Sequence, residues 1–145
     1  MQAASTNPPR EQGMIKRGIQ IFLAVFFFVA GILHFHLDDA FARIVPPMLP
    51  VPVAIVWITG VMEFAFAAAL MARWRLPLTG LLLSAYLLAV LPANIYMAIA
   101  GIPLGDTVLS PAALWTRVAL QFPLIALVLW CTGAPPFRKA PGTED

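Results

Sequence analysis

Four long runs of apolar residues, separated by short connections that are polar or rich in proline, dominate the chain. A helix needs roughly 20 apolar residues to cross the hydrocarbon core of a bilayer. Proline stands near the start of three runs, as Pro52, Pro77 and Pro111, where its missing N–H costs a helix little. The pattern predicts an all-α membrane protein, a four-transmembrane-helix bundle with spans over residues 18–35, 53–72, 76–100 and 112–131.

The first run has a second interpretation, because Lys16 and Arg17 precede it as the charged region of a secretory signal peptide would. The run is longer than the apolar core of such a peptide and lacks a clear A-x-A cleavage site, so we interpret it as a span. The chain then forms a single membrane domain, residues 1–145. Its polar tails, residues 1–12 and 134–145, are expected to be flexible.

Composition supports the membrane class and excludes others. Apolar residues make up 61% of the chain and charged residues 11%, whereas soluble proteins average about 45–50% and about 25%. The net charge is +2, but the basic residues form no patch interleaved with aromatic residues. We therefore expect a lipid bilayer, and no nucleic acid, as the partner of this chain. Cys131 is the single cysteine, which excludes an internal disulfide, a CxxC redox pair and a cysteine-based metal cluster.

The charged residues predict the orientation, because Lys and Arg in short loops stay on the cytoplasmic side of a membrane. The N-terminal tail, the connection between the second and third spans, and the C-terminal tail together hold Arg10, Lys16, Arg17, Arg73, Arg75, Arg138 and Lys139. The other two connections hold Asp38, Asp39, Arg43 and Asp106. We therefore predict cytoplasmic N and C termini and an integral protein of the plasma (inner) membrane.

The first outer connection contains the apolar residues Phe41, Ile44 and Val45 at helical spacing, followed by a proline-rich stretch over residues 46–52. This pattern predicts a short interfacial helix and then a stiff, extended segment. The connection could lie over the mouth of the bundle, or it could be a simple connector held at the lipid headgroups.

Two charges fall inside the predicted spans. Glu63 is about ten residues into the second span, near the bilayer midplane, where an acidic group costs roughly 2.5–3.5 kcal/mol. Arg117 is about five residues into the fourth span from the same outer side, so the two differ in depth by about 8 Å. Opposite charges attract strongly in a medium of low dielectric constant, and we expect Glu63 and Arg117 to pair.

Other polar residues lie at similar depth, so that all four spans contribute to the outer half of the bundle. His34 ends the first span, Asn94 lies near the outer end of the third, and Gln121 lies one turn beyond Arg117 on the fourth. The inner half holds little beyond Thr79, Ser84 and Tyr86. Small residues, among them Gly31 and Gly60, would let neighbouring helices approach closely.

This polar cluster has two interpretations. In a structural clamp, Arg117 neutralises Glu63, while Asn94 and Gln121 satisfy the remaining donors. In a small-molecule pocket open to the outer leaflet, Arg117 binds an anion or carbonyl, and Glu63 or His34 carries a proton. His34 by itself also fits an ordinary interfacial histidine. The acidic and histidine residues near it offer too few ligands for a metal, and no metal site is predicted.

The sequence also resembles the DoxX-like family of small membrane proteins. The resemblance rests on five segments in order: residues 31–35 (GILHF), 44–50 (IVPPMLP), 59–63 (TGVME), 91–97 (LPANIYM) and 117–121 (RVALQ). The family often has a proline within the last segment and a serine before the glycine of the third, where this chain has Ala119 and Thr59. The resemblance implies a four-helix membrane bundle, and it links some relatives with quinone oxidoreductase subunits and others with complexes that handle oxidative stress.

Three functions follow as hypotheses. The first is a DoxX-like membrane protein whose outer-half pocket, lined by His34, Glu63, Asn94, Arg117 and Gln121, binds a small lipophilic or quinone-like ligand. The second is a membrane subunit of a quinone-linked oxidoreductase, which needs a redox partner protein because the chain itself carries no cofactor motif. The third is a structural or assembly subunit. The sequence leaves enzymatic activity and catalytic residues open, and it is compatible with a homo-oligomer.

Overall fold

The computed structural model describes residues 8–137, and these are helical apart from short connections. The elements in chain order are α1 (Pro8–His36), α2 (Asp38–Ala42), α3 (Pro52–Met71), α4 (Leu76–Ala100) and α5 (Pro111–Thr132). All of them except α2 are long and apolar enough to cross a membrane. The prediction of an all-α protein is confirmed, and so is the prediction of four helices long and apolar enough to span a membrane.

The ends of the long helices follow local sequence signals. Proline occupies the first turn of α3, α4 and α5. At the start of α5 the Ser110 hydroxyl accepts a hydrogen bond from the Ala113 N–H at 3.2 Å, which satisfies one free donor of the first turn. Gly101 and Gly133 end α4 and α5 in the left-handed conformation, with φ of 61° and 68°, which glycine adopts without strain.

Helix α1 begins ten residues before the predicted span, at Pro8, so residues 8–12 belong to the helix and not to a separate tail. Residues 1–7 and 138–145, which make up most of the two predicted tails, lie outside the described residues. Within the described part of the C-terminal tail, Ala134 is fully buried.

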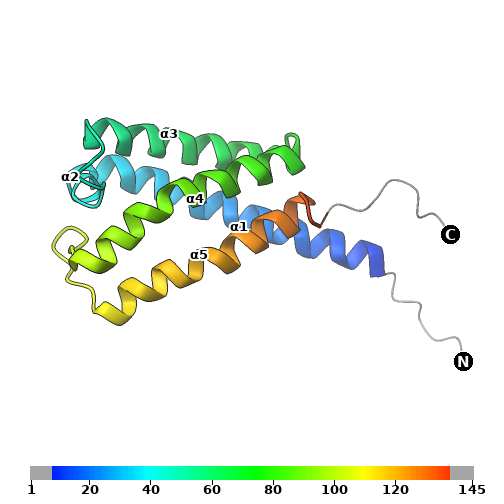
Figure 1. Ribbon diagram of the computed structural model, residues 1–145. Coiled ribbons are helices and arrows are strands. Elements are labelled where there is room, and N and C mark those ends of the chain that lie inside the picture. Colours follow the sequence, from blue (N-terminus) through cyan, green and yellow to red (C-terminus); the bar gives the residue numbers. More distant parts are fainter. Residues whose placement is uncertain (1–7, 138–145) are drawn as a thin grey trace, which may run out of the picture.

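The long helices form two pairs, α1 with α3 and α4 with α5 (Figure 1). The pairs pack together at the end that holds the α3–α4 turn, and they diverge toward the end that holds α2. All four long helices contribute to the main core near the α3–α4 turn, through residues that include Leu23, Leu70, Leu83 and Val128, each with 0% exposure. The bundle is therefore closely packed at the end that holds the α3–α4 turn, called here the closed end. It opens toward the other end, called here the α2 end.

Close backbone contacts fix each pair. A Cβ added to Gly60 would lie 2.9 Å from the His34 Cβ, and one added to Gly31 would lie 3.1 Å from the Gly60 carbonyl oxygen. These glycines confirm the predicted close approach and bring His34 against α3. In the other pair, a Cβ on Gly80 would overlap the Thr132 side chain, so α4 and α5 touch near the closed end.

The connection between α1 and α3 covers the α2 end. Ile44, only 5% exposed, packs with Met97, Leu114 and Val118 of the other helix pair. Phe41 of α2 stacks on the His34 ring with 4.4 Å between ring centroids, and the Trp57 indole donates to Asp38 Oδ2 at 3.1 Å. Of the two interpretations of this connection, the structure favours the one in which it lies across the mouth of the bundle.

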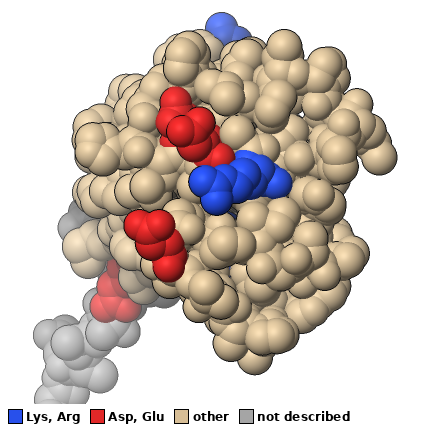
Figure 2. All heavy atoms as spheres, turned by 90° about the vertical axis from the view of Figure 1, so that its left-hand side faces the viewer, with Lys and Arg blue, Asp and Glu red and all other residues tan. Residues whose placement is uncertain are grey.

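The two ends differ in charge. Asp38, Asp39, Arg43 and Asp106 belong to the connections at the α2 end, where Figure 2 shows a few charged side chains on an otherwise uncharged surface. At the opposite end the Arg17 guanidinium donates to the Leu70 and Met71 carbonyl oxygens at 3.3 and 3.2 Å, which gives two carbonyls in the last turn of α3 a charged donor. Arg73 and Arg75 lie beside it in the α3–α4 turn.

Candidate functional site

A cavity of about 930 Å³ lies between the diverging helix pairs. Such a volume is typical of small-molecule sites, which range over about 300–1,000 Å³. Most of the lining is apolar and includes Phe27, Ile44 and Leu124. The polar side chains in the lining are His34, Thr59, Glu63, Tyr86, Asn94, Arg117 and Gln121. The structure thus brings all five sequence-predicted site residues to the wall of one cavity.

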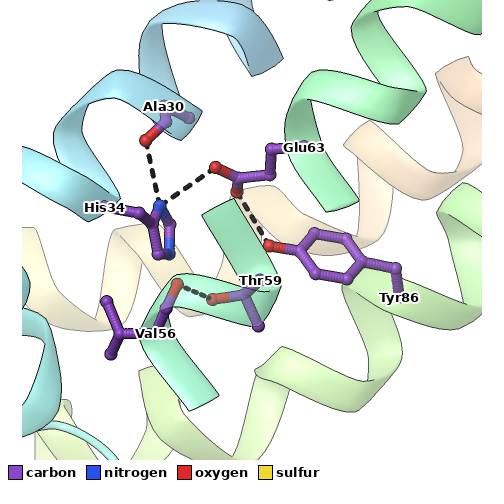
Figure 3. Close-up of polar contacts among 6 residues, drawn as sticks. All are labelled: Ala30, His34, Val56, Thr59, Glu63 and Tyr86. Atoms are coloured by element: carbon purple, nitrogen blue, oxygen red, sulfur yellow. Dashed lines mark hydrogen bonds and ion pairs between the residues drawn. The ribbon is translucent and has the colours of Figure 1, made fainter. Parts of the chain in front are cut away.

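Glu63 forms the centre of the first polar group, called here the carboxylate cluster and made of His34, Glu63 and Tyr86 (Figure 3). The Glu63 side chain comes from α3, and the residue is 5% exposed. The Tyr86 hydroxyl of α4 donates to Glu63 Oε1 at 2.8 Å. His34 of α1 places its Nδ1 3.0 Å from Glu63 Oε2. Three helices therefore meet at one buried carboxylate.

The two Glu63 oxygens differ in how well they are satisfied. His34 Nδ1 lies 2.9 Å from the Ala30 carbonyl oxygen and 3.0 Å from Glu63 Oε2, and a single N–H does not point at both acceptors. The imidazole nitrogen is therefore shared between two acceptors, and Glu63 Oε2, which is buried, has no other donor among the described residues. The nearby Thr59 hydroxyl does not donate to this oxygen, because it donates to the Val56 carbonyl oxygen of its own helix at 2.8 Å. Glu63 Oε2 is thus a buried acceptor at the cavity wall with capacity left for a donor.

Arg117 forms the centre of the second polar group, called here the guanidinium cluster and made of Asn94, Met97, Arg117 and Gln121. The Arg117 guanidinium donates to Asn94 Oδ1 and to Met97 Sδ, both at 3.3 Å. Asn94 Nδ2 donates to Gln121 Oε1 at 3.0 Å, and Gln121 Nε2 donates to the Leu87 carbonyl. All four side chains come from α4 and α5. The cluster ties these two helices together with a cation whose protein partners are neutral.

The predicted pairing of Glu63 with Arg117 is wrong. Among residues 8–137, the ion-pair partner of Glu63 is His34, and Arg117 has no carboxylate within 4.0 Å. The reason is the separation of the two helix pairs across the bundle. Glu63 and Arg117 belong to different helix pairs, which diverge at this depth, whereas the glycine contacts between α1 and α3 press His34 against Glu63. His34 contacts Glu63 and Phe41, and its depth in a bilayer stays a prediction.

Tyr86 is the site residue that sequence reasoning missed, because it was assigned to the inner half of the bundle. Tyr86 lies ten residues beyond Leu76, and Glu63 lies eleven residues beyond Pro52 at the opposite end of the bundle. At about 1.5 Å per residue, both positions fall near the middle of a hydrocarbon core about 30 Å thick. Counting residues inward from the first residue of each helix would have placed the Tyr86 hydroxyl at the same depth as the Glu63 carboxylate.

The cavity offers hydrogen-bonding groups of two kinds on opposite walls. The α1–α3 wall presents a carboxylate oxygen that accepts, and the α4–α5 wall presents a guanidinium and amide groups that donate. The described residues contain no group of three or more His, Cys, Asp or Glu side chains placed to hold a metal ion. Cys131 is buried near the closed end, with its thiol toward the Val128 carbonyl, and it lies ten residues beyond Gln121 along α5. The arrangement suits an uncharged or weakly polar organic molecule with both donor and acceptor groups.

A family model described as a domain of unknown function (DUF8561) matches residues 23–132. The matched stretch contains both polar clusters and the cavity between them. The chain belongs to the DUF8561 family. No curated protein and no solved structure matches it. Because the DUF8561 description assigns no activity and is not a DoxX-like one, the resemblance to DoxX-like proteins stays a prediction.

Proposed function

We propose that this DUF8561 protein is an integral membrane protein that binds a small lipophilic, quinone-like molecule in the cavity between its helix pairs. One observation carries the proposal: Glu63 Oε2 is a buried carboxylate oxygen at the wall of an apolar cavity of about 930 Å³, and it is left without a donor when the His34 N–H beside it points to the Ala30 carbonyl. A buried polar atom without a partner costs about 1–3 kcal/mol. A ligand hydroxyl that donates to this oxygen would recover that cost.

The opposite wall supports the same class of ligand. The Arg117 guanidinium has neutral protein partners, so a carbonyl oxygen in the cavity would gain a charged donor. A quinone offers carbonyl oxygens, and its reduced form offers hydroxyl groups on the same ring. The reduced form would suit Glu63, the oxidised form would suit Arg117, and the apolar lining would hold the ring.

A second candidate is a subunit of a quinone-linked oxidoreductase. It is favoured by the hydrogen-bonded series from Tyr86 to Glu63, with His34 in contact, because these are proton-carrying side chains beside the proposed ligand. The lone Cys131 supplies no redox pair, so electrons would come from a partner protein in the membrane. In this role the chain would bind the quinone and deliver or accept its proton.

The proposal includes the predicted DoxX-like relationship and orientation, with both termini cytoplasmic and the α2 end facing outward from the plasma (inner) membrane. Lys16, Arg17, Arg73 and Arg75 gather at the end opposite α2, in agreement with the preference of basic loops for the cytoplasm. Single cysteines at Trp74 and Thr107, introduced with Cys131→Ser, test the orientation in intact cells. A membrane-impermeant maleimide should label Thr107→Cys and leave Trp74→Cys unlabelled, and the reverse labelling would contradict it.

Binding itself is tested by calorimetric titration of decyl-ubiquinone and its quinol into the purified protein in lipid nanodiscs. Glu63→Gln should weaken quinol binding at least tenfold, and Arg117→Gln should weaken quinone binding similarly. Trp57→Phe, an exposed position outside the cavity, serves as the control and should leave both affinities unchanged. If the folded wild-type protein binds neither form, the proposal fails. If Glu63→Gln lowers thermal stability while both affinities stay intact, the clusters are structural.

A further inference from the structure

The routes into the cavity are restricted at both ends of the bundle. At the closed end the core residues Leu23, Leu70, Leu83 and Val128 leave no exposed side-chain surface. At the α2 end the connection between α1 and α3 lies across the mouth, with Ile44 buried against α4 and α5. A ligand that moves along the bundle axis would have to displace one of these packed layers. The remaining routes into the cavity pass between helices at the sides of the bundle.

The cavity lining reaches the lipid-facing surface at the sides. Between α1 and α5, Phe26 and Leu120 line the cavity and are 48% and 59% exposed. Between α3 and α4, Met62 and Leu82 line the cavity and are also exposed. Each diverging side therefore joins the cavity to the surroundings of the bundle, which in a membrane are lipid chains.

The α1 side carries an additional feature. A second groove of about 340 Å³ runs along α1 and is lined by Phe22, Val25, Phe26, Val29, Ala30 and Leu33. Phe26, Ala30 and Leu33 also line the main cavity, so the two spaces adjoin along these side chains. The lining residues are all apolar and follow one helical face, and from residue 22 to residue 33 the groove extends about 16 Å along the helix. This is a shape for a hydrocarbon tail.

We infer that the ligand of the cavity is a long-tailed, lipid-soluble molecule that enters sideways from the bilayer beside α1 and keeps its tail in the α1 groove. The inference rests on the proposed function and narrows its ligand class. The oxygen-bearing ring lies between Glu63 and Arg117, while the alkyl or isoprenoid tail passes Ala30 and follows Val29 and Val25 toward the surrounding lipid. Compact, water-soluble quinones have the ring but lack the part that the groove holds.

The experiment compares decyl-ubiquinone with the same ring bearing no tail, each titrated into the full chain in nanodiscs. Val25→Trp with Val29→Trp fills the groove and leaves the cavity lining unchanged, because neither residue lines the main cavity. Ile21→Trp with Ile32→Trp is the matched control, as both residues are exposed on α1 and line neither space.

Filling the groove should raise the Kd of decyl-ubiquinone at least tenfold and change that of the tail-less ring by less than twofold. The control should change both by less than threefold. The groove variant should also slow the association of decyl-ubiquinone in stopped-flow mixing, and an association rate equal to that of the wild type overturns entry beside α1. Equal wild-type affinity for both ligands, unaffected by the groove variant, overturns the tail site alone. Failure of the wild type to bind either ligand overturns the proposed function itself.

Discussion

The separation of Glu63 from Arg117 can be measured with double-mutant cycles. Glu63 contacts His34 and Tyr86, whereas Arg117 contacts Asn94 and Met97, so the two charges share no partner among the described residues. Mutations at sites without shared partners add to within about 0.5 kcal/mol. Glu63→Gln and Arg117→Gln should therefore show a coupling energy below about 0.5 kcal/mol.

The same carboxylate should couple strongly to the hydroxyl that touches it. Interhelical hydrogen bonds in membranes average about 0.6 kcal/mol and reach about 1.7 kcal/mol. A bond to a carboxylate is roughly twice as strong as a neutral one, so the 2.8 Å bond from Tyr86 should give a coupling of about 1–2 kcal/mol in the cycle of Glu63→Gln with Tyr86→Phe.

Reversible unfolding in mixed micelles with increasing SDS gives the four free energies of each cycle, and both cycles share the wild type and Glu63→Gln. A coupling above about 1 kcal/mol for Glu63 with Arg117, together with none for Glu63 with Tyr86, would refute the division into two clusters. It would restore the direct ion pair that the sequence predicts.

Two further predictions concern packing. Gly60→Ala should destabilise the fold by about 1–3 kcal/mol in the same unfolding assay, because the new methyl would lie 2.8–2.9 Å from the Phe35 ring and the His34 Cβ; a neutral effect would show that α1 and α3 are farther apart. Gln20→Leu should cost about 0.6–1.7 kcal/mol, because the buried Gln20 amide donates to the Cys131 carbonyl at 2.7 Å. Loss of this hydrogen bond should loosen the packing of α1 on α5, so Gln20→Leu should also speed alkylation of the buried Cys131 thiol. An unchanged alkylation rate would argue against the contact between Gln20 and Cys131.

The helices could be read from the sequence because their limits depend on local chemistry. Predicted residues 76–100 coincide with α4, whose ends are marked by Pro77 and Gly101. The start of α1 differs for a physical reason. Hydropathy locates the point where a chain enters the hydrocarbon core, whereas backbone hydrogen bonding continues through charged residues that favour helix, such as Glu11 and Lys16.

The candidate site could be predicted in composition but not in connectivity. Depth along a helix follows from residue counts, which is why Glu63, Arg117 and Gln121 were expected at the level of one polar region. Lateral position depends on which helices touch and at what angle, and residue counts do not contain that information. The choice of His34 over Arg117 as the neighbour of Glu63 was settled by the α1–α3 glycine contacts.

The hydrogen bond from the Gln20 amide of α1 to the Cys131 carbonyl of α5 joins the two helix pairs at the end where they meet. Because the carboxylate is carried by one pair and the guanidinium by the other, the spacing between them is set by the angle between the pairs. The closed end is thus a hinge between the two helix pairs, and each pair carries one of the two charges at a distance from this hinge. Substitutions that repack this hinge would change the distance between Glu63 and Arg117 across the cavity without altering any residue that lines it.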